Sequence, residues 1–216
     1  MPRIALIHAL AHSVAPINVA FEAGWPQAQR MNLLDDSLSA DLARSGRGLD
    51  DAMNARFQAL AGYAVDTGAQ AILFTCSAFG PCIEAVARRH ADIPVLKPNE
   101  AMIEEAATGG GSGPLGLLAT FGPTLESMPP EFPRAFMLDP MLVQGAFEAL
   151  DAGDAAAHDA LIAGAARKLK ERGCTRIALA QFSMARARQV CAEATGLPVL
   201  TTVDSAVRAL RRRLED

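Results

Sequence analysis

Two distant segments of this chain follow the same pattern, and they differ at one chemically important position. Residues 68–79 lead on to a Pro-Val-Leu run at 94–96, and residues 173–184 lead on to the same run at 198–200. Eight positions after its first glycine, one copy carries Cys76 and the other carries Gln181. In each copy, the apolar run between the glycine and this position has the length and composition of a buried parallel strand. The sequence therefore predicts that a thiol and an amide occupy equivalent strand ends.

The repeat extends to other segments in the same order. Residues 4–8 resemble 115–119, and residues 30–38 resemble 134–142. Strand-like runs alternate with helical patterns, which favours an α/β fold with parallel sheets. We expect two similar, duplicated α/β domains related by a pseudo-twofold axis, formed by residues 1–97 plus 201–216 and by residues 98–200. The expected strands are 3–7, 29–33, 69–74, 94–96, 115–119, 135–138, 176–180 and 198–200.

Composition limits the classes of function. The chain has 216 residues, 50% of them apolar and 20% charged, which is typical of a globular protein. Its net charge of −4 gives no basic surface for nucleic acid, and we interpret the arginines at 208 and 211–213 as a solvated helix face. With no signal peptide and no apolar run of about 18 residues, we expect a cytoplasmic protein without membrane contact.

Neither a metal nor a nucleotide cofactor is expected. The four cysteines, at 76, 82, 174 and 191, form no CxxC pair and have no neighbouring histidine cluster. The glycine-rich run 109–113 follows a helical pattern and precedes a strand. Phosphate loops have the opposite order, because they follow a strand and begin a helix. We interpret this run as a turn.

Cys76 is the strongest candidate for a catalytic residue. Ligands of open parallel sheets bind at the carboxyl ends of the strands, and a thiol just before a helix is expected to have a lowered pKa. Thr75 and Ser77 add hydroxyl groups, and backbone N–H groups of the turn through Ala78 could hold a carboxylate or an enediolate. The alternative is a buried structural cysteine at the end of a core strand.

The second copy offers an amide and a hydroxyl in place of the thiol. Gln181 can orient a carboxylate but cannot transfer protons at neutral pH, and it could instead cap its own helix. Phe182 and Ser183 follow it, and Ser183 is a candidate anion ligand. His8 and Thr120 end the first strands of the two halves. His8 is either a proton carrier or carboxylate partner, or a structural residue.

Two acids follow the second strand of the first half. Asp35 and Asp36 precede Ser37, which is a combination that commonly forms a turn and caps a helix. Capping is expected for at least one of these side chains. Asp36 or Ser37 could still face a ligand.

Taken together, these segments resemble the aspartate/glutamate racemase superfamily, which includes hydantoin racemase, maleate isomerase and arylmalonate decarboxylase. The resemblance rests on residues 34–39, 74–79, 96–101, 116–120 and 180–184. It implies two similar α/β domains with the site in the cleft between them, no pyridoxal phosphate, no metal, and a homodimer. In such enzymes two cysteines on opposite faces of the substrate carbon act as base and acid.

This sequence departs from the family pattern at one of the two cysteines. The first family cysteine matches Cys76, whereas the second matches Gln181. Arylmalonate decarboxylase also keeps a single cysteine, although on the other side. By motif match, Ser77, Thr120 and Ser183 would hold the substrate carboxylate. The resemblance adds His8 and Asn18 as further candidates.

The resulting hypothesis is a cofactor-independent isomerase that moves a proton at the α-carbon of a small carboxylic acid. Racemisation with one cysteine needs a second proton donor, for which His8 or a water could serve. A single thiol suffices for decarboxylation or for cis–trans isomerisation. A non-catalytic module that binds a carboxylate is a further alternative. Three aromatic residues near the turns, Phe79, Phe121 and Phe182, could favour a substituent larger than that of aspartate.

Overall fold

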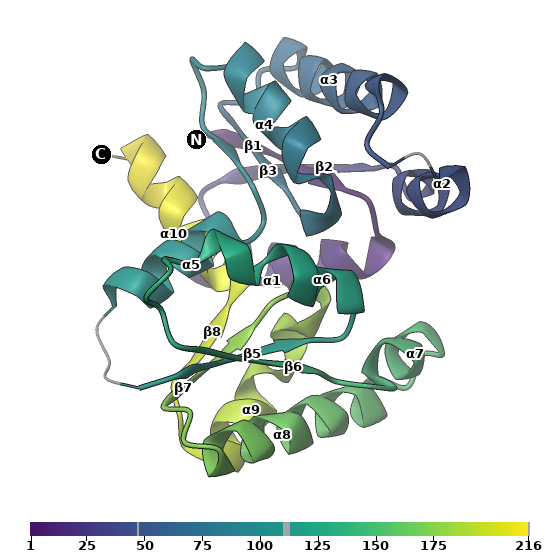
Figure 1. The fold of residues 1–216 in the computed structure, drawn as a ribbon. Helices are drawn as coiled ribbons and strands as arrows, with labels where there is room; N and C mark the ends of the chain where they lie inside the picture. Colours follow the sequence, from purple (N-terminus) through teal and green to yellow (C-terminus); the bar gives the residue numbers. More distant parts are fainter. Residues whose placement is uncertain (47, 110–112, 216) are drawn as a thin grey trace. The chain divides into compact units, whose positions relative to one another are not determined.

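A computed structural model describes residues 1–46, 48–109 and 113–215. The chain forms two compact units, residues 1–98 with 206–216 and residues 99–205. The sequence placed these boundaries after residues 97 and 200. Each unit is an α/β structure with one four-stranded parallel sheet (Figure 1). Residues 110–112 of the glycine-rich run lie outside the described residues.

The first unit has the strand order β2-β1-β3-β4. Its strands are β1 (Arg3–His8), β2 (Gln29–Leu34), β3 (Ala71–Phe74) and β4 (Val95–Leu96). Its helices are α1 (Val14–Gly24), α2 (Ser37–Ser45), α3 (Asp51–Asp66) and α4 (Gly80–Arg89), with short 3₁₀ turns η1 (Ala11–Ser13) and η2 (Ser77–Phe79). The last helix, α10 (Thr202–Glu215), starts among residues of the second unit and continues into the first.

The second unit repeats this order as β6-β5-β7-β8. Its strands are β5 (Leu115–Ala119), β6 (Leu138–Leu142), β7 (Arg176–Leu179) and β8 (Val199–Thr201). Its helices are α5 (Glu100–Thr108), α6 (Gly122–Ser127), α7 (Ala146–Asp151), α8 (Ala155–Glu171) and α9 (Arg188–Thr195), with 3₁₀ turns η3 (Pro129–Glu131) and η4 (Phe182–Ala187). The identical strand order confirms the predicted α/β class and the presence of two similar domains.

Backbone hydrogen bonds define which residues of the two units are equivalent. In the first unit the Thr75 N–H donates to the Ile7 carbonyl, and in the second the Ala180 N–H donates to the Leu118 carbonyl. Both bonds join the first strand of a unit to the end of its third strand. The residues that follow the two donors are therefore structurally equivalent, and they are Cys76 and Gln181.

The glycines that begin the two repeats also have the same role. Gly68 and Gly173 have φ angles of 87° and 94°, in the left-handed region that a side chain disfavours. Each follows a long helix, and their N–H groups donate to the carbonyls of Val65 and Lys170. This is the usual glycine termination of a helix, which turns the chain into the next strand.

One expected strand is wrong. Residues 135–137 are not in a strand, and β6 instead runs from Leu138 through Pro140 to Leu142. Pro140 is tolerated because β6 pairs with β5 alone and lies at the edge of the sheet. The N–H groups of Asp35 and Val143 bond to the ends of β1 and β5, so Val143 is the equivalent of Asp35. The match of residues 30–38 to 134–142 was therefore out of register.

Helices cover the sheets (Figure 1) and pack on them through buried apolar side chains. In the first unit α3 and α4 pack on one face, where Phe57 and Ile83 join Ile7 and Phe74 in one core. In the second unit α8 and α9 cover one face and α5 covers the other. Buried residues occur on both faces because parallel strands are covered on both sides. No helix among the described residues is long and apolar enough to cross a membrane.

Gly116 allows α8 to approach the sheet closely. A Cβ atom at this position in β5 would lie 2.7 Å from Leu169 Cδ1 and 3.1 Å from Ile177 Cδ1. The Leu169 Cβ atom would also be 3.1 Å away, so rotation of the leucine side chain alone cannot relieve the crowding. The helix and the sheet would have to separate.

We expect Gly116→Ala to lower the free energy of unfolding by roughly 1–3 kcal/mol, the usual cost of overpacking a core. Gly164→Ala, in α8 of the same unit, is the matched control, because the nearest atom to its added Cβ is 4.0 Å away. That change should stabilise the protein slightly through helix propensity. Denaturant unfolding of the two variants measures the difference, and equal stabilities would contradict the packing argument.

Candidate active site

The direction in which strands are added to the sheet reverses at the equivalent point in the two units. In the first unit the chain passes from β1 to β2 on one side and then to β3 on the other, and β5, β6 and β7 repeat this path. Ligands of open α/β sheets bind at the carboxyl ends of the strands next to such a reversal. Cys76 and Gln181 lie just beyond β3 and β7, and each is the residue that precedes a 3₁₀ turn.

Cys76 differs from the other cysteines in its exposure. It is partly exposed, whereas the cysteines at 82, 174 and 191 are buried. Apolar side chains line a small cavity at the thiol, contributed by Ile7, Leu38, Phe57 and Phe74. The thiol therefore lies where the apolar core of the first unit meets the surface, at the carboxyl ends of the strands.

The pKa of Cys76 shifts in the direction opposite to the one expected. Burial raises the pKa of the thiol, while a hydrogen bond from the Ala78 N–H and one from the Ser39 hydroxyl lower it less strongly. The Ala78 N–H lowers the pKa of the thiol, as expected for a thiol at the start of a helix. The turn that follows Cys76, η2, has only three residues, however. Desolvation by the apolar neighbours outweighs these hydrogen bonds.

His8 is fully buried and both of its ring nitrogens have partners. Nδ1 lies 3.0 Å from Thr75 Oγ1, and Nε2 lies 3.0 Å from Asn32 Oδ1. Burial lowers the pKa of His8, and the hydrogen bond to Asn32 opposes this only in part. The imidazole is therefore neutral near pH 7.

The Asn18 side chain determines the tautomer of His8. Its NH₂ group donates to the Val14 carbonyl at 2.7 Å and to Asn32 Oδ1 at 3.0 Å. Because Asn32 Oδ1 can only accept, His8 Nε2 carries the proton and donates to it. The unprotonated Nδ1 then accepts a hydrogen bond from the Thr75 hydroxyl.

These contacts change the roles expected for three residues. His8 has 0% exposure and no free nitrogen, so the geometry does not fit a proton carrier. Thr75 is 5% exposed and bonds to His8, which makes it a link between β1 and β3. Asn18 belongs to the same network. Burial of the first strand on both faces produces this outcome, because a buried polar side chain must find partners inside the protein.

The turn after Cys76 retains groups that can hold an anion. Ser77 is partly exposed and Ala78 is exposed. Their backbone N–H groups begin η2, where N–H groups have no partner within the turn. A carboxylate beside Cys76 could accept hydrogen bonds there.

In the second unit, Gln181 is directed back to the first strand. Its Oε1 atom accepts hydrogen bonds from the Thr120 N–H at 2.6 Å and from Thr120 Oγ1 at 3.0 Å. Gln181 makes no side-chain cap to the turn that follows it, so the capping alternative is wrong. With its oxygen used, the NH₂ group is the part of this side chain that can bind a ligand.

The aromatic residues near the turns are placed differently from one another. Phe79 is buried in the first core, with its ring centroid 4.9 Å from that of Phe57, and Phe182 is 2% exposed. Phe121 is 48% exposed and remains a candidate for contact with a substituent. Ser183 is partly exposed. Apolar character alone did not separate core residues from exposed ones.

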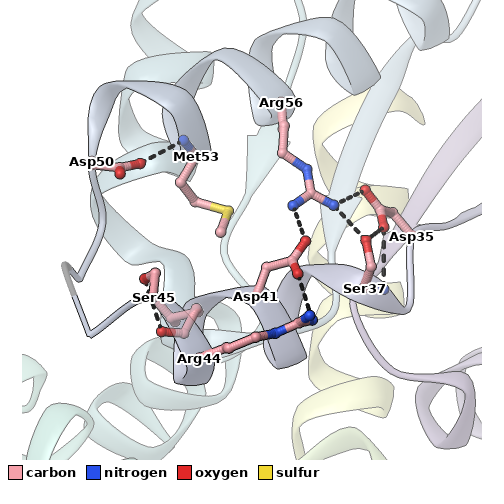
Figure 2. A network of polar contacts seen from close by, with 9 residues as sticks. Asp35, Ser37, Asp41, Arg44, Ser45, Asp50, Met53 and Arg56 are labelled. Atoms are coloured by element: carbon pink, nitrogen blue, oxygen red, sulfur yellow. Dashed lines mark hydrogen bonds and ion pairs between the residues drawn. The ribbon is translucent and has the colours of Figure 1, made fainter.

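An arginine that the sequence did not single out joins three polar side chains after β2 (Figure 2). Arg56 of α3 contacts Asp35 Oδ2 at 2.6 Å, Ser37 Oγ at 2.6 Å and Asp41 Oδ2 at 2.7 Å. Asp35 also accepts hydrogen bonds from the Ser37 N–H and hydroxyl, so Asp35 forms the turn, while Asp36 makes no cap. Burial opposes the shift, but Ser37 and Arg56 lower the pKa of Asp35.

The described residues contain no group of three or more His, Cys, Asp or Glu side chains that could hold a metal ion.

Arg56 could not have been found from local spacing, because its partners lie on a turn and a helix earlier in the chain.

We expect iodoacetamide to alkylate Cys76 before the other three cysteines in the native protein. The reactive species is the thiolate, and burial raises the pKa of Cys76, so the rate should rise with pH with an inflection above that of a free thiol. Mass spectrometry of digests identifies the site, and Cys76→Ala gives the background rate. An inflection below the free-thiol value, or first labelling elsewhere, would be the contrary result.

Comparison with known proteins agrees with this architecture. Structures with similar folds include an allantoin racemase from Klebsiella pneumoniae, at 19% identity and a TM-score of 0.74, covering 100% of this chain and 88% of that one. A glutamate racemase from Bacillus anthracis has 11% identity and a TM-score of 0.73, with coverages of 99% and 82%. The Picrophilus torridus aspartate racemase has 12% identity and a TM-score of 0.71, with coverages of 99% and 94%.

At these identities the similar structures establish the fold alone. Among curated proteins, none matches the sequence significantly. The family model for Asp/Glu/hydantoin racemases, however, matches residues 17–210, which is most of the chain. This chain belongs to the Asp/Glu/hydantoin racemase family.

Proposed function

We propose that this protein is a cofactor-independent enzyme that moves a proton at the carbon next to a carboxylate, with Cys76 as the proton-transferring group. The observation that carries the proposal is the position of Cys76. It is a partly exposed thiol at the strand reversal of the first unit, beside the N–H groups of the turn through Ala78. The substrate class we propose is a small carboxylic acid.

In the proposed reaction the Cys76 thiolate removes the α-proton. The C–H bond breaks, the proton moves to Sγ, and the electron pair moves into the carboxylate to give an enediolate. N–H groups at Ser77 and Ala78 would stabilise the added negative charge. The raised pKa has two consequences, since it makes the thiolate a stronger base and reduces its population at neutral pH.

Gln181 is assigned to binding. An amide neither gives nor takes protons at neutral pH, and its oxygen is already hydrogen-bonded to Thr120. We propose that its NH₂ group, together with the Ser183 hydroxyl, binds a substrate oxygen. A reaction that returns the proton to the opposite face then requires water, because His8 is buried with both nitrogens occupied.

The glutamine also favours a second candidate function. A reaction that protonates one face needs a single thiol, as in decarboxylation of a malonate-type acid or thiolate addition during cis–trans isomerisation. A non-catalytic carboxylate-binding module is the third possibility, and it would not need the thiol. The expected homodimer, cytoplasmic location and absence of nucleic-acid partners stay predictions.

The experiment that tests the proposal is incubation with small amino, hydroxy and malonate-type acids in deuterated water. We expect α-hydrogen exchange, with loss of optical rotation if the product racemises and with carbon dioxide release if it decarboxylates. NMR, polarimetry and gas detection follow the three outcomes. Exchange with retained configuration indicates a one-base enzyme.

Cys76→Ala should abolish whichever activity is found, by at least about 100-fold if the thiol is the general base. Cys191→Ala is a control, because that thiol is fully buried in the second unit. Full activity in a folded Cys76→Ala variant would refute the assignment. Binding of an acid without exchange in the wild type would support the carboxylate-binding module.

We expect Gln181→Cys to create or raise racemase activity, because it restores a proton-transferring group at the position equivalent to Cys76. Gln181→Ala is the matched control, since it removes the same amide without adding a thiol. Rates of α-proton exchange and of optical inversion measure the effect. If a folded Gln181→Cys variant shows no gain, that result counts against a functional equivalence of positions 76 and 181.

A further inference from the structure

The second strand of each unit lies at the edge of its sheet. Among the described strands, β2 pairs with β1 alone (Figure 1), and β6 pairs with β5 alone. An edge strand presents backbone N–H and C=O groups on its outer side, where another strand can pair with them, and proteins usually protect such an edge. The residues that point outward decide whether an edge is protected.

In β2 the outward backbone groups belong to Arg30, Asn32 and Leu34. The N–H groups of Gln29 and Asp35 donate to carbonyl groups at the two ends of the β1 segment. Backbone groups alternate in direction along a strand, so residues 29, 31, 33 and 35 point towards β1. The three residues between them point away from the sheet.

The equivalent edge of the second unit is protected by a proline. Because Val143 is the equivalent of Asp35, Pro140 is the equivalent of Asn32. Pro140 thus occupies the middle outward position of β6, and it has no N–H group to donate there. β2 has six residues and no proline, so its edge can pair along its whole length.

Exposed apolar side chains gather along this open edge. The large apolar side chains that are exposed in the described part of the first unit are those of Met1, Val19, Leu34 and Tyr63. Leu34 is on β2 itself. Val19 is one turn from Glu22 on the same face of α1, and Glu22 Oε1 lies 3.1 Å from Arg30 Nη1. One face of the edge is therefore flanked by α1.

The other face of the edge is flanked by α3, beside an open hollow of about 700 Å³. Residues 29–33 line the hollow from β2, and Tyr63 and Thr67 line it from α3 and its end. The Thr67 hydroxyl lies 3.4 Å from Met31 Sδ, which places this end of α3 next to the strand. Such an edge fits an added β-strand, whose backbone pairs with it and whose side chains fill the space beside it.

Symmetry and charge favour a second copy of β2 as the added strand. Antiparallel pairing about Asn32 is the register that pairs all three outward residues of each copy. It sets Arg30 opposite the partner's Leu34, so the two arginines do not face each other, which would be unfavourable. It also covers the exposed Leu34 side chain.

We propose that two copies of this chain associate through their β2 strands, antiparallel about Asn32, so that the two first-unit sheets form one continuous sheet. Each outward pair in this register exchanges two backbone hydrogen bonds. The inference goes beyond the proposed function and does not depend on it, because it concerns a surface and not the reaction.

The first test is the oligomeric state of the full chain, measured by sedimentation velocity over a concentration series. The wild type should be a dimer. Leu34→Pro removes an outward N–H group from each copy and should raise the dissociation constant at least roughly tenfold. Leu142→Pro is the matched control, because Leu142 is the equivalent outward residue of β6 and has 40% exposure against 47% for Leu34. The control should dimerise as the wild type does.

A monomeric wild type overturns the proposal, and this is the result expected if the edge instead receives an extended segment of a different protein. Wild-type dimerisation in a folded Leu34→Pro variant overturns it as well, because the copies would then associate through another surface. Equal weakening by Leu142→Pro is a third contrary result. Circular dichroism shows whether each variant is folded.

A pair of charge variants tests the register and remains available if Leu34→Pro does not fold. Leu34→Lys places a cation opposite the partner's Arg30, whereas Leu34→Glu places an anion there. Since two such pairs form in each dimer, the dissociation constant of the lysine variant should be roughly tenfold higher than that of the glutamate variant. Equal dissociation constants overturn the proposed pairing.

Discussion

The pairing of the first strand with the third in each sheet is the constraint on which the rest depends. The chain crosses from one side of the first strand to the other at this pair, so the carboxyl ends of β1 and β3, and of β5 and β7, lie together. A side-chain hydrogen bond closes each pair, from Thr75 to His8 in one unit and from Thr120 to Gln181 in the other. The turn that follows each third strand is thereby fixed.

The two units use this common frame differently. In the first unit, the buried His8 makes the cross-strand contact with Thr75. Cys76, which follows Thr75, takes no part in that contact. In the second, Gln181 itself makes the cross-strand contact, with Oε1 2.6 Å from the Thr120 N–H. The glutamine is thus part of the architecture of its strand end. The two sheets share one strand order, while the equivalent strand ends carry a thiol in one unit and an amide in the other.

The sequence predicted much of the fold because its strongest signals are periodic and local. Buried parallel strands appear as apolar runs, and the glycines at 68 and 173 mark helix ends that need a left-handed residue. The second strand of the second unit was misplaced; β6 contains Pro140, which a strand tolerates at the edge of a sheet, and only the tertiary structure shows that β6 is an edge strand. Phe79 and Phe182 were candidates for contact with a substituent and are buried instead, because local pattern does not reveal packing.

By itself, the sequence determined the α/β class, the duplication and the position of Cys76 at a strand end, since these follow from chain-local pattern and repetition. Only the tertiary structure decided how each polar group is used. The burial of His8, the raised pKa of Cys76 and the contacts of Arg56 depend on residues that are distant in the chain. Hydrogen bonding and desolvation are set by whichever groups folding brings within a few ångströms, and no spacing rule along the chain encodes that distance.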